Sequence, residues 1–145
     1  MGLLSNDEYV AREQLRPLLT LDNPTVLVVD DERVVADTLA IILRNDGFNA
    51  MAAYGGEVAV AIARESPLHF LVCDIALMDG MTGIEVAIQI GALRPDCRVI
   101  LISGIAASSD LLEKAHAQGH EFEVLGKPFH PTLLIDLLRG SAPLL

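Results

Sequence analysis

The chain has 145 residues, of which 52% are hydrophobic and 21% charged, and its formal net charge is −10. This length suits one domain with a sizeable core, and the composition argues against disorder. The excess of acidic residues argues against non-specific binding to nucleic acid. No apolar run approaches the ~20 residues that cross a bilayer, and the N-terminus does not read as a signal peptide. Because the two cysteines form no disulfide framework, we expect a cytoplasmic domain without nucleic-acid or membrane contacts.

Residues 1–23 differ from the rest of the chain. Ser5 followed by Glu8 is a capping-box pattern, which predicts a short helix that Pro17 interrupts. Such a helix would pack on the domain or on a partner, whereas the alternative is a frayed extension. We therefore divide the chain into an N-terminal extension (1–23), one domain (24–140) and a tail (141–145).

Short apolar runs and helical patterns alternate from residue 25 onward. Runs of β-branched and aliphatic residues indicate strands that are buried on both faces, as in a parallel sheet. Four such runs end on polar residues: Thr25–Val29 before Asp30 and Asp31, Phe70–Cys73 before Asp74, Arg98–Ile102 before Ser103, and Phe122–Gly126 before Lys127. A weaker, shorter strand is predicted from Phe48 to Ala52.

Each predicted strand is followed by apolar residues at helical spacing. The apolar stripes that mark the five helices are Val35–Leu43, Val58–Ile62, Ile84–Ile88, Leu111–Ala115 and Leu133–Leu138. Gly47, Ser66-Pro67, Arg94-Pro95 and Gly119 stand where the first four helices would end. This fivefold alternation predicts a doubly wound α/β fold around a parallel sheet with right-handed crossovers.

The polar residues at the strand ends form a chemically coherent set. Ligands of parallel sheets bind beyond the carboxyl ends of the strands, so these side chains are expected to converge. Asp30 and Asp31 suit a magnesium ion, one or both through water. Asp74 adds a carboxylate that can attack phosphorus, while Ser103 and Lys127 can hold phosphoryl oxygens. The sequence therefore predicts a site for a divalent cation and a phosphoryl group.

Five segments, in this order, carry a resemblance to a known family: Val28–Asp31, Val72–Asp74, Met81–Glu85, Leu101–Gly104 and Leu125–Phe129. Over about residues 24–139 the sequence resembles the receiver domains of two-component response regulators. The resemblance implies a flavodoxin-like, five-stranded parallel sheet with strand order 2-1-3-4-5. It also implies a cis peptide before Pro128, since X-Pro bonds have only a small trans preference.

The resemblance assigns a role to each site residue. Asp74 would be the phosphoacceptor and also a metal ligand. Asp31 would be a direct metal ligand, with Asp30 acting mainly through water. The backbone carbonyl of Ala76 would be a further ligand, and the phosphoryl group would contact Ser103 and Lys127. The implied cofactor is Mg²⁺.

The resemblance also implies partners. A sensor histidine kinase or phosphotransfer protein would donate the phosphoryl group. A downstream protein, or a second copy in a homodimer, would read the signal through residues 107–139. The chain would not be an enzyme beyond its own phosphorylation and dephosphorylation.

Three departures from the family pattern affect details. Leu77 and Met78 replace the usual Met-Pro after the acceptor, and the stretch to the next helix is one residue longer. Val124 occupies the place of the family's switch aromatic. Ala76 and Ile105 are apolar and cannot orient a hydrolytic water by side-chain hydrogen bonds.

Two other functions remain open from the sequence. A haloacid-dehalogenase-like phosphatase uses similar groups, but it needs an acid where Ala76 stands and places its acidic pair late in the chain. A receiver-like interaction module that is independent of phosphate is favoured by Val124 and the altered loop.

The spacing of His116 and His120 allows zinc binding on a helix. Gly119 between them indicates that the helix has ended, and no third ligand is apparent in the sequence. We therefore expect no zinc site there.

Overall fold

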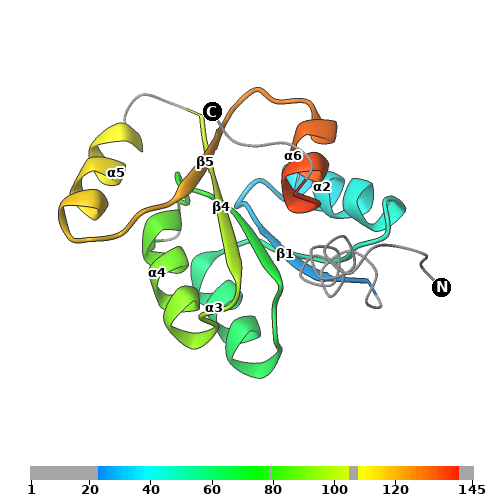
Figure 1. The fold of residues 1–145 in the computed structure, drawn as a ribbon, viewed down its shortest axis with the longest axis horizontal. Helices are drawn as coiled ribbons and strands as arrows, with labels where there is room; N and C mark the ends of the chain where they lie inside the picture. Colours follow the sequence, from blue (N-terminus) through cyan, green and yellow to red (C-terminus); the bar gives the residue numbers. More distant parts are fainter. Residues whose placement is uncertain (1–22, 79, 105–107, 141–145) are drawn as a thin grey trace, which may run out of the picture.

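The computed structural model describes residues 23–78, 80–104 and 108–140 (Figure 1). Their strands form one parallel sheet in the order β2-β1-β3-β4-β5, which confirms the predicted topology. The strands are β1 (Thr25–Val29), β2 (Asn49–Ala53), β3 (Phe70–Asp74), β4 (Arg98–Ser103) and β5 (Glu123–Gly126). The expected helix over part of residues 1–23 and the tail at 141–145 lie outside the described residues, so this division of the chain stays a prediction.

Five helices cover the two faces of the sheet: α2 (Arg33–Asn45), α3 (Gly56–Glu65), α4 (Gly83–Leu93), α5 (Ser108–Ala117) and α6 (Pro131–Leu138). In Figure 1, α2 and α6 lie on one side of the sheet, while α3, α4 and α5 lie on the other. No helix in the described part of the chain is both long enough and apolar enough to span a bilayer.

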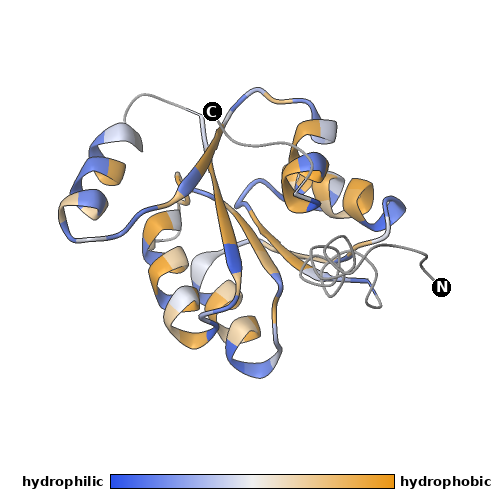
Figure 2. Ribbon diagram, in the orientation of Figure 1, coloured by the Kyte–Doolittle hydropathy of each residue, from blue (hydrophilic) through white to orange (hydrophobic). Residues whose placement is uncertain are grey.

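The core consists of one apolar layer on each side of the sheet. Leu27, Leu71 and Leu101 pack among residues of α3 and α4. Val28 and Val72 belong to the opposite layer, with residues of α2 and α6. Successive strand residues point to opposite faces, and both faces are covered, so the middle residues of the central strands are hydrophobic, with polar residues only at the strand ends (Figure 2).

Two predicted strands begin one residue later than expected. Phe48 precedes β2, because its amide donates to the Leu43 carbonyl at the end of α2 and is not available to the sheet. Phe122 precedes β5 and is half-buried in the layer that contains α4 and α5. Both differences affect only strand ends.

Local capping fixes where helices begin. Thr82 and Glu85 form a capping box at the start of α4, with hydrogen bonds of 3.1 and 2.9 Å between each side chain and the other residue's amide. The His130 Nδ1 atom accepts a hydrogen bond from the Thr132 amide, and Pro131 is the first residue of α6.

The start of α4 lies directly against the end of β3. The Gly83 amide donates to the Ile75 carbonyl at 2.9 Å, and a Cβ atom on Gly83 would lie 2.1 Å from the Asp74 carbonyl oxygen. Only glycine therefore fits there. This close approach positions the segment that follows Asp74, in which Met78 is 84% exposed.

Candidate functional site

Three carboxylates meet at the carboxyl edge of the sheet, where β1 and β3 end. One oxygen from each of Asp30, Asp31 and Asp74 lies within 4.8 Å of the other two. Asp30 is 3% exposed and Asp74 is 7% exposed, whereas Asp31 is half-buried. The pairing of β1 with β3 brings these residues together although more than forty positions separate them. The acidic cluster predicted from the sequence is therefore present in the structure.

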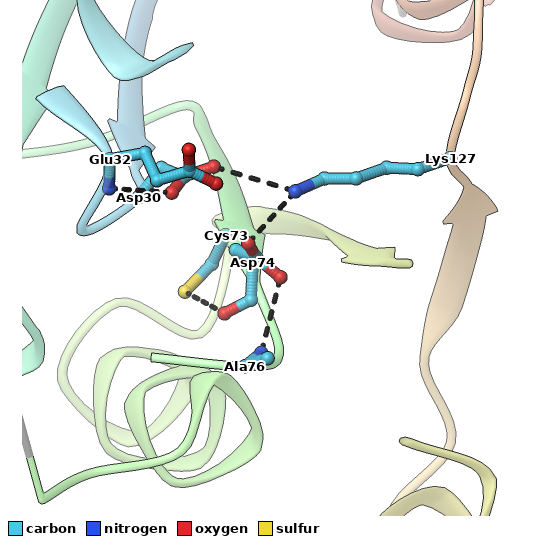
Figure 3. A network of polar contacts seen from close by, with 6 residues as sticks. All are labelled: Asp30, Glu32, Cys73, Asp74, Ala76 and Lys127. Atoms are coloured by element: carbon cyan, nitrogen blue, oxygen red, sulfur yellow. Dashed lines mark hydrogen bonds and ion pairs between the residues drawn. The ribbon is translucent and has the colours of Figure 1, made fainter. Parts of the chain in front are cut away.

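Lys127 reaches this cluster from the end of β5. Its Nζ atom lies 2.9 Å from Asp74 Oδ2 and 3.7 Å from Asp30 Oδ2 (Figure 3). The peptide bond between Lys127 and Pro128 is cis, as the resemblance implied. Gly104 leaves room for the lysine stem, since a Cβ there would lie 3.3 Å from Lys127 Cδ. One ammonium thus contacts two carboxylates that come from different strands.

Backbone amides hold the second carboxylate oxygens of Asp30 and Asp74. Asp30 Oδ1 accepts from the Glu32 amide at 2.9 Å, and Asp74 Oδ1 accepts from the Ala76 amide at 3.1 Å (Figure 3). These bonds orient both side chains, and they leave Asp74 Oδ2 facing Lys127.

Charge and burial shift the titration of two groups. Burial raises the pKa of Asp30, and the negative charges of Asp74 and Asp31 raise it further. The hydrogen bond from the Glu32 amide and the charge of Lys127 lower it, but the net shift is upward. For Lys127, burial alone would lower the pKa, but the hydrogen bond and charge of Asp74, with Asp30 and Glu32, raise it overall. The surroundings of Asp30 therefore oppose its ionisation, and those of Lys127 favour its charged form.

The donor set fits a hard divalent cation. Mg²⁺ and Ca²⁺ take oxygen ligands and are bound through a few carboxylates together with waters and substrate oxygens. Three carboxylates facing one ammonium leave an excess of negative charge at this edge. Asp30, Asp31 and Asp74 would hold the ion.

The contacts of Ser103 and Ala76 near the cluster are made by their backbone atoms. Ser103 ends β4 next to β5, and its backbone carbonyl accepts a 2.8 Å hydrogen bond from the Lys127 amide. The Ala76 contact is made by its amide, whereas the expected metal contact concerns its carbonyl. Their assigned roles stay predictions.

Sequence reasoning missed Glu32. Its charge acts on Lys127, and the two residues line the same apolar groove beside α2 and the segment after β5. Its position directly after the acidic pair was the available signal.

The two spaced histidines contact different partners. His116 Nδ1 lies 2.5 Å from a Glu121 oxygen, and the His120 ring stacks on Phe122 at a centroid distance of 6.2 Å. Within the described residues the acidic trio is the one group close enough to hold a metal.

The fold and the edge cluster define a receiver-type α/β domain, and comparison with known proteins agrees. The response regulator receiver domain family matches residues 26–139, so the chain belongs to this family of two-component signalling domains. Receiver domains are signalling modules rather than classical enzymes.

One relative is the probable transcriptional regulatory protein TcrX of Mycobacterium tuberculosis. It is 35% identical over 116 residues, which are 80% of this chain and 48% of that protein. The regulator FixJ of Rhizobium meliloti is 31% identical over 118 residues, or 81% of this chain and 56% of FixJ. The chain thus spans about half the length of these curated relatives. Because they are transcriptional regulators, the expectation of no nucleic-acid contact stays a prediction.

Two solved structures that are similar in fold contain ligands. A Burkholderia pseudomallei response regulator with a phosphorylated aspartic acid, calcium ion and citrate has a TM-score of 0.69 and 26% identity, and the match covers 80% of this chain and 66% of that one. TrrA of Thermotoga maritima in complex with Mg²⁺-BeF has a TM-score of 0.68 and 27% identity, with 82% and 99% covered.

Proposed function

We propose that this chain is a phosphoacceptor receiver that takes a phosphoryl group from a phosphohistidine partner onto Asp74. The observation that carries the proposal is the 2.9 Å contact between Lys127 Nζ and Asp74 Oδ2 beside the carboxylates of Asp30 and Asp31. The phosphorylated aspartate in the Burkholderia pseudomallei relative and the Mg²⁺-BeF in TrrA support the same chemistry.

The transfer needs no other reactant. An Asp74 carboxylate oxygen donates an electron pair to phosphorus and forms an acyl phosphate. The phosphorus–nitrogen bond of the donor histidine breaks, and its electron pair stays on the imidazole. The donor imidazole carries a proton on its other ring nitrogen, so departure of the phosphoryl group leaves a neutral histidine. The protein thereby gains one phosphoryl group and one net negative charge.

Residues around Asp74 prepare it for this attack. The Ala76 amide fixes one carboxylate oxygen, and the burial of the side chain limits competing water. Lys127 holds the second oxygen in the structure, so it is well placed to pass to an oxygen of the incoming phosphoryl group. Ser103, at the end of the adjacent strand, would donate its hydroxyl to another phosphoryl oxygen.

The implied cofactor is Mg²⁺, held by Asp30, Asp31 and Asp74. When bound, it would neutralise charge on the carboxylates and on the phosphoryl oxygens.

The signal would pass from this edge to the surface formed by α5, β5 and α6. Ser103 and Lys127 are joined by a backbone hydrogen bond, so a shift of either residue at the phosphoryl group acts on the paired ends of β4 and β5. The reader of that surface would be a downstream protein or a second copy of the chain.

A labelling experiment tests this function. The protein is incubated with Mg²⁺ and acetyl phosphate, and the expected result is a mass increment of one phosphoryl group that is stable in acid and lost in base. Asp74→Asn should abolish the label, whereas Asp96→Asn, an exposed aspartate in the turn before β4, should not. Absence of label with this donor and with a phosphohistidine donor would instead indicate a module that is independent of phosphate. Continuous release of phosphate from many esters would indicate a phosphatase.

A further inference from the structure

Arg33 is an unusual cation in this fold because of where it lies. It is the first residue of α2, two positions after Asp31, at the carboxyl edge of the sheet. A positive side chain in the first turn of a helix opposes the helix dipole. Apart from Lys127, the other described Lys and Arg residues lie at the opposite edge of the sheet. They stand at the C-terminal ends of helices or at the start of β4, and they are Arg44, Arg64, Arg94, Arg98, Lys114 and Arg139.

The Tyr54 ring holds Arg33 in this place, and Asp37 in turn holds Tyr54. Its guanidinium carbon lies 4.3 Å from the centroid of the Tyr54 ring, a cation–π contact. The Tyr54 hydroxyl donates a 2.6 Å hydrogen bond to Asp37, one helical turn beyond Arg33. That hydrogen bond, with further effects of burial and of the Asp37 charge, raises the pKa of Tyr54. The ring is therefore fixed against α2 as a support for the guanidinium.

Strand order places this support beside the acidic cluster. Tyr54 directly follows β2, and the Asp30 amide donates to the carbonyl of Ala53 at 3.1 Å. Lys127 follows β5 at the other end of the sheet, so the two cations flank the carboxylates from opposite sides. With strands about 4.8 Å apart, the backbones of β2 and β3 are about 10 Å apart, and this spacing sets the order of magnitude of the distance from the guanidinium to Asp74.

We propose that Arg33 is a charge-positioning residue that draws anionic phosphodonors toward Asp74 and weakens the hold of the acidic cluster on cations. The inference rests on the proposed function, because it concerns the same phosphorylation reaction. The chain carries a net charge of −10, so a donor dianion that approaches three carboxylates is repelled on average. Over about 10 Å of water, one positive charge changes the local concentration of a dianion roughly fourfold.

Arg33 acts on anions and cations in opposite directions. Removing Arg33 should lower the second-order rate constant for the donor and raise the affinity for Mg²⁺, each by roughly fourfold at low ionic strength. A purely structural role would reduce both quantities. At high salt both effects should disappear, because the Debye length falls to about 3 Å at 1 M.

The test compares Arg33→Gln with Arg64→Gln, which makes the same charge change in the last turn of α3 at the opposite edge. Phosphorylation is measured by mass spectrometry with acetyl phosphate, a dianion, and with phosphoramidate, which carries less negative charge. Mg²⁺ affinity is measured by calorimetry. We expect Arg33→Gln to slow phosphorylation by acetyl phosphate more than phosphorylation by phosphoramidate, and to tighten Mg²⁺ binding. Arg64→Gln should do neither.

Other outcomes overturn the inference. Equal effects of the two substitutions would assign the change to net charge alone, and an unchanged rate and affinity in Arg33→Gln would remove any role. Loss of both the rate constant and the Mg²⁺ affinity in Arg33→Gln would indicate a structural role. Arg33→Lys keeps the charge, so a structural role predicts the same loss in that variant. If the wild-type protein is not labelled at all, the proposed function fails, whereas the Mg²⁺ measurement still decides whether Arg33 acts on the cluster.

Discussion

Replacing Asp30 by asparagine should make the protein more stable in the absence of divalent cations. The ionised side chain is almost fully buried and lies within 4.8 Å of oxygens of Asp31 and Asp74, while its attraction to Lys127 acts over 3.7 Å. With an effective dielectric constant of about 20, the two repulsions together exceed the attraction by about 2 kcal/mol. Asparagine keeps an oxygen to accept the Glu32 amide, so the change removes charge with little loss of geometry.

We therefore expect Asp30→Asn to raise the free energy of unfolding in EDTA by about 2 kcal/mol, or the melting temperature by about 6 °C. Burial and neighbouring charges raise the pKa of Asp30 in the folded state. The cost of ionising it is thus present at neutral pH and disappears as the pH falls through the folded-state pKa toward the unfolded value near 3.8. The gain of the variant should shrink over the same range.

Urea unfolding of the wild type, Asp30→Asn and the exposed control Asp96→Asn, each with EDTA and with Mg²⁺, measures this effect. The wild type should gain stability on adding Mg²⁺ by mass action, and Asp30→Asn should gain less. The reasoning is refuted if Asp30→Asn is no more stable than wild type in EDTA, or if Mg²⁺ stabilises both equally.

Three further predictions concern other residues near the site. Gly83→Ala should destabilise the fold by about 3 kcal/mol or more, because its Cβ would overlap backbone at the end of β3. Gly91→Ala, in the open part of α4, should stabilise the fold by about 0.5–1 kcal/mol. Urea unfolding of both variants measures these changes. The pKa of Lys127 is raised, so its ion pairs should stabilise the protein at neutral pH. This stabilisation should be lost above pH 10.5, as the pH rises through the folded-state pKa. A difference in the free energy of unfolding between the wild type and Lys127→Met that stays constant to pH 12 would contradict this. Ultraviolet titration in a Tyr9→Phe background should place the pKa of Tyr54 above its usual value of 10.0, and Asp37→Asn should bring it back down.

Much of the fold was predictable because its signals are local. Apolar runs of strand length that end on Asp30, Asp74 and Lys127 fix both the alternation of elements and the edge at which polar groups collect. Helix ends followed from residues such as Gly47, which adopts a φ of 97° just after α2. Strand starts were less certain, since Phe48 is used by the preceding helix cap rather than by β2.

Pairwise contacts across the sheet were decided by tertiary structure. The contact of Lys127 with Asp74 spans 53 positions and depends on the pairing of β3, β4 and β5. The place of Arg33 over Tyr54 depends in the same way on the position of β2 beside α2. Residue types and spacing determine which groups reach one edge of a parallel sheet. Which of them meet there is set by strand order and side-chain packing, because these bring together atoms that no local pattern relates.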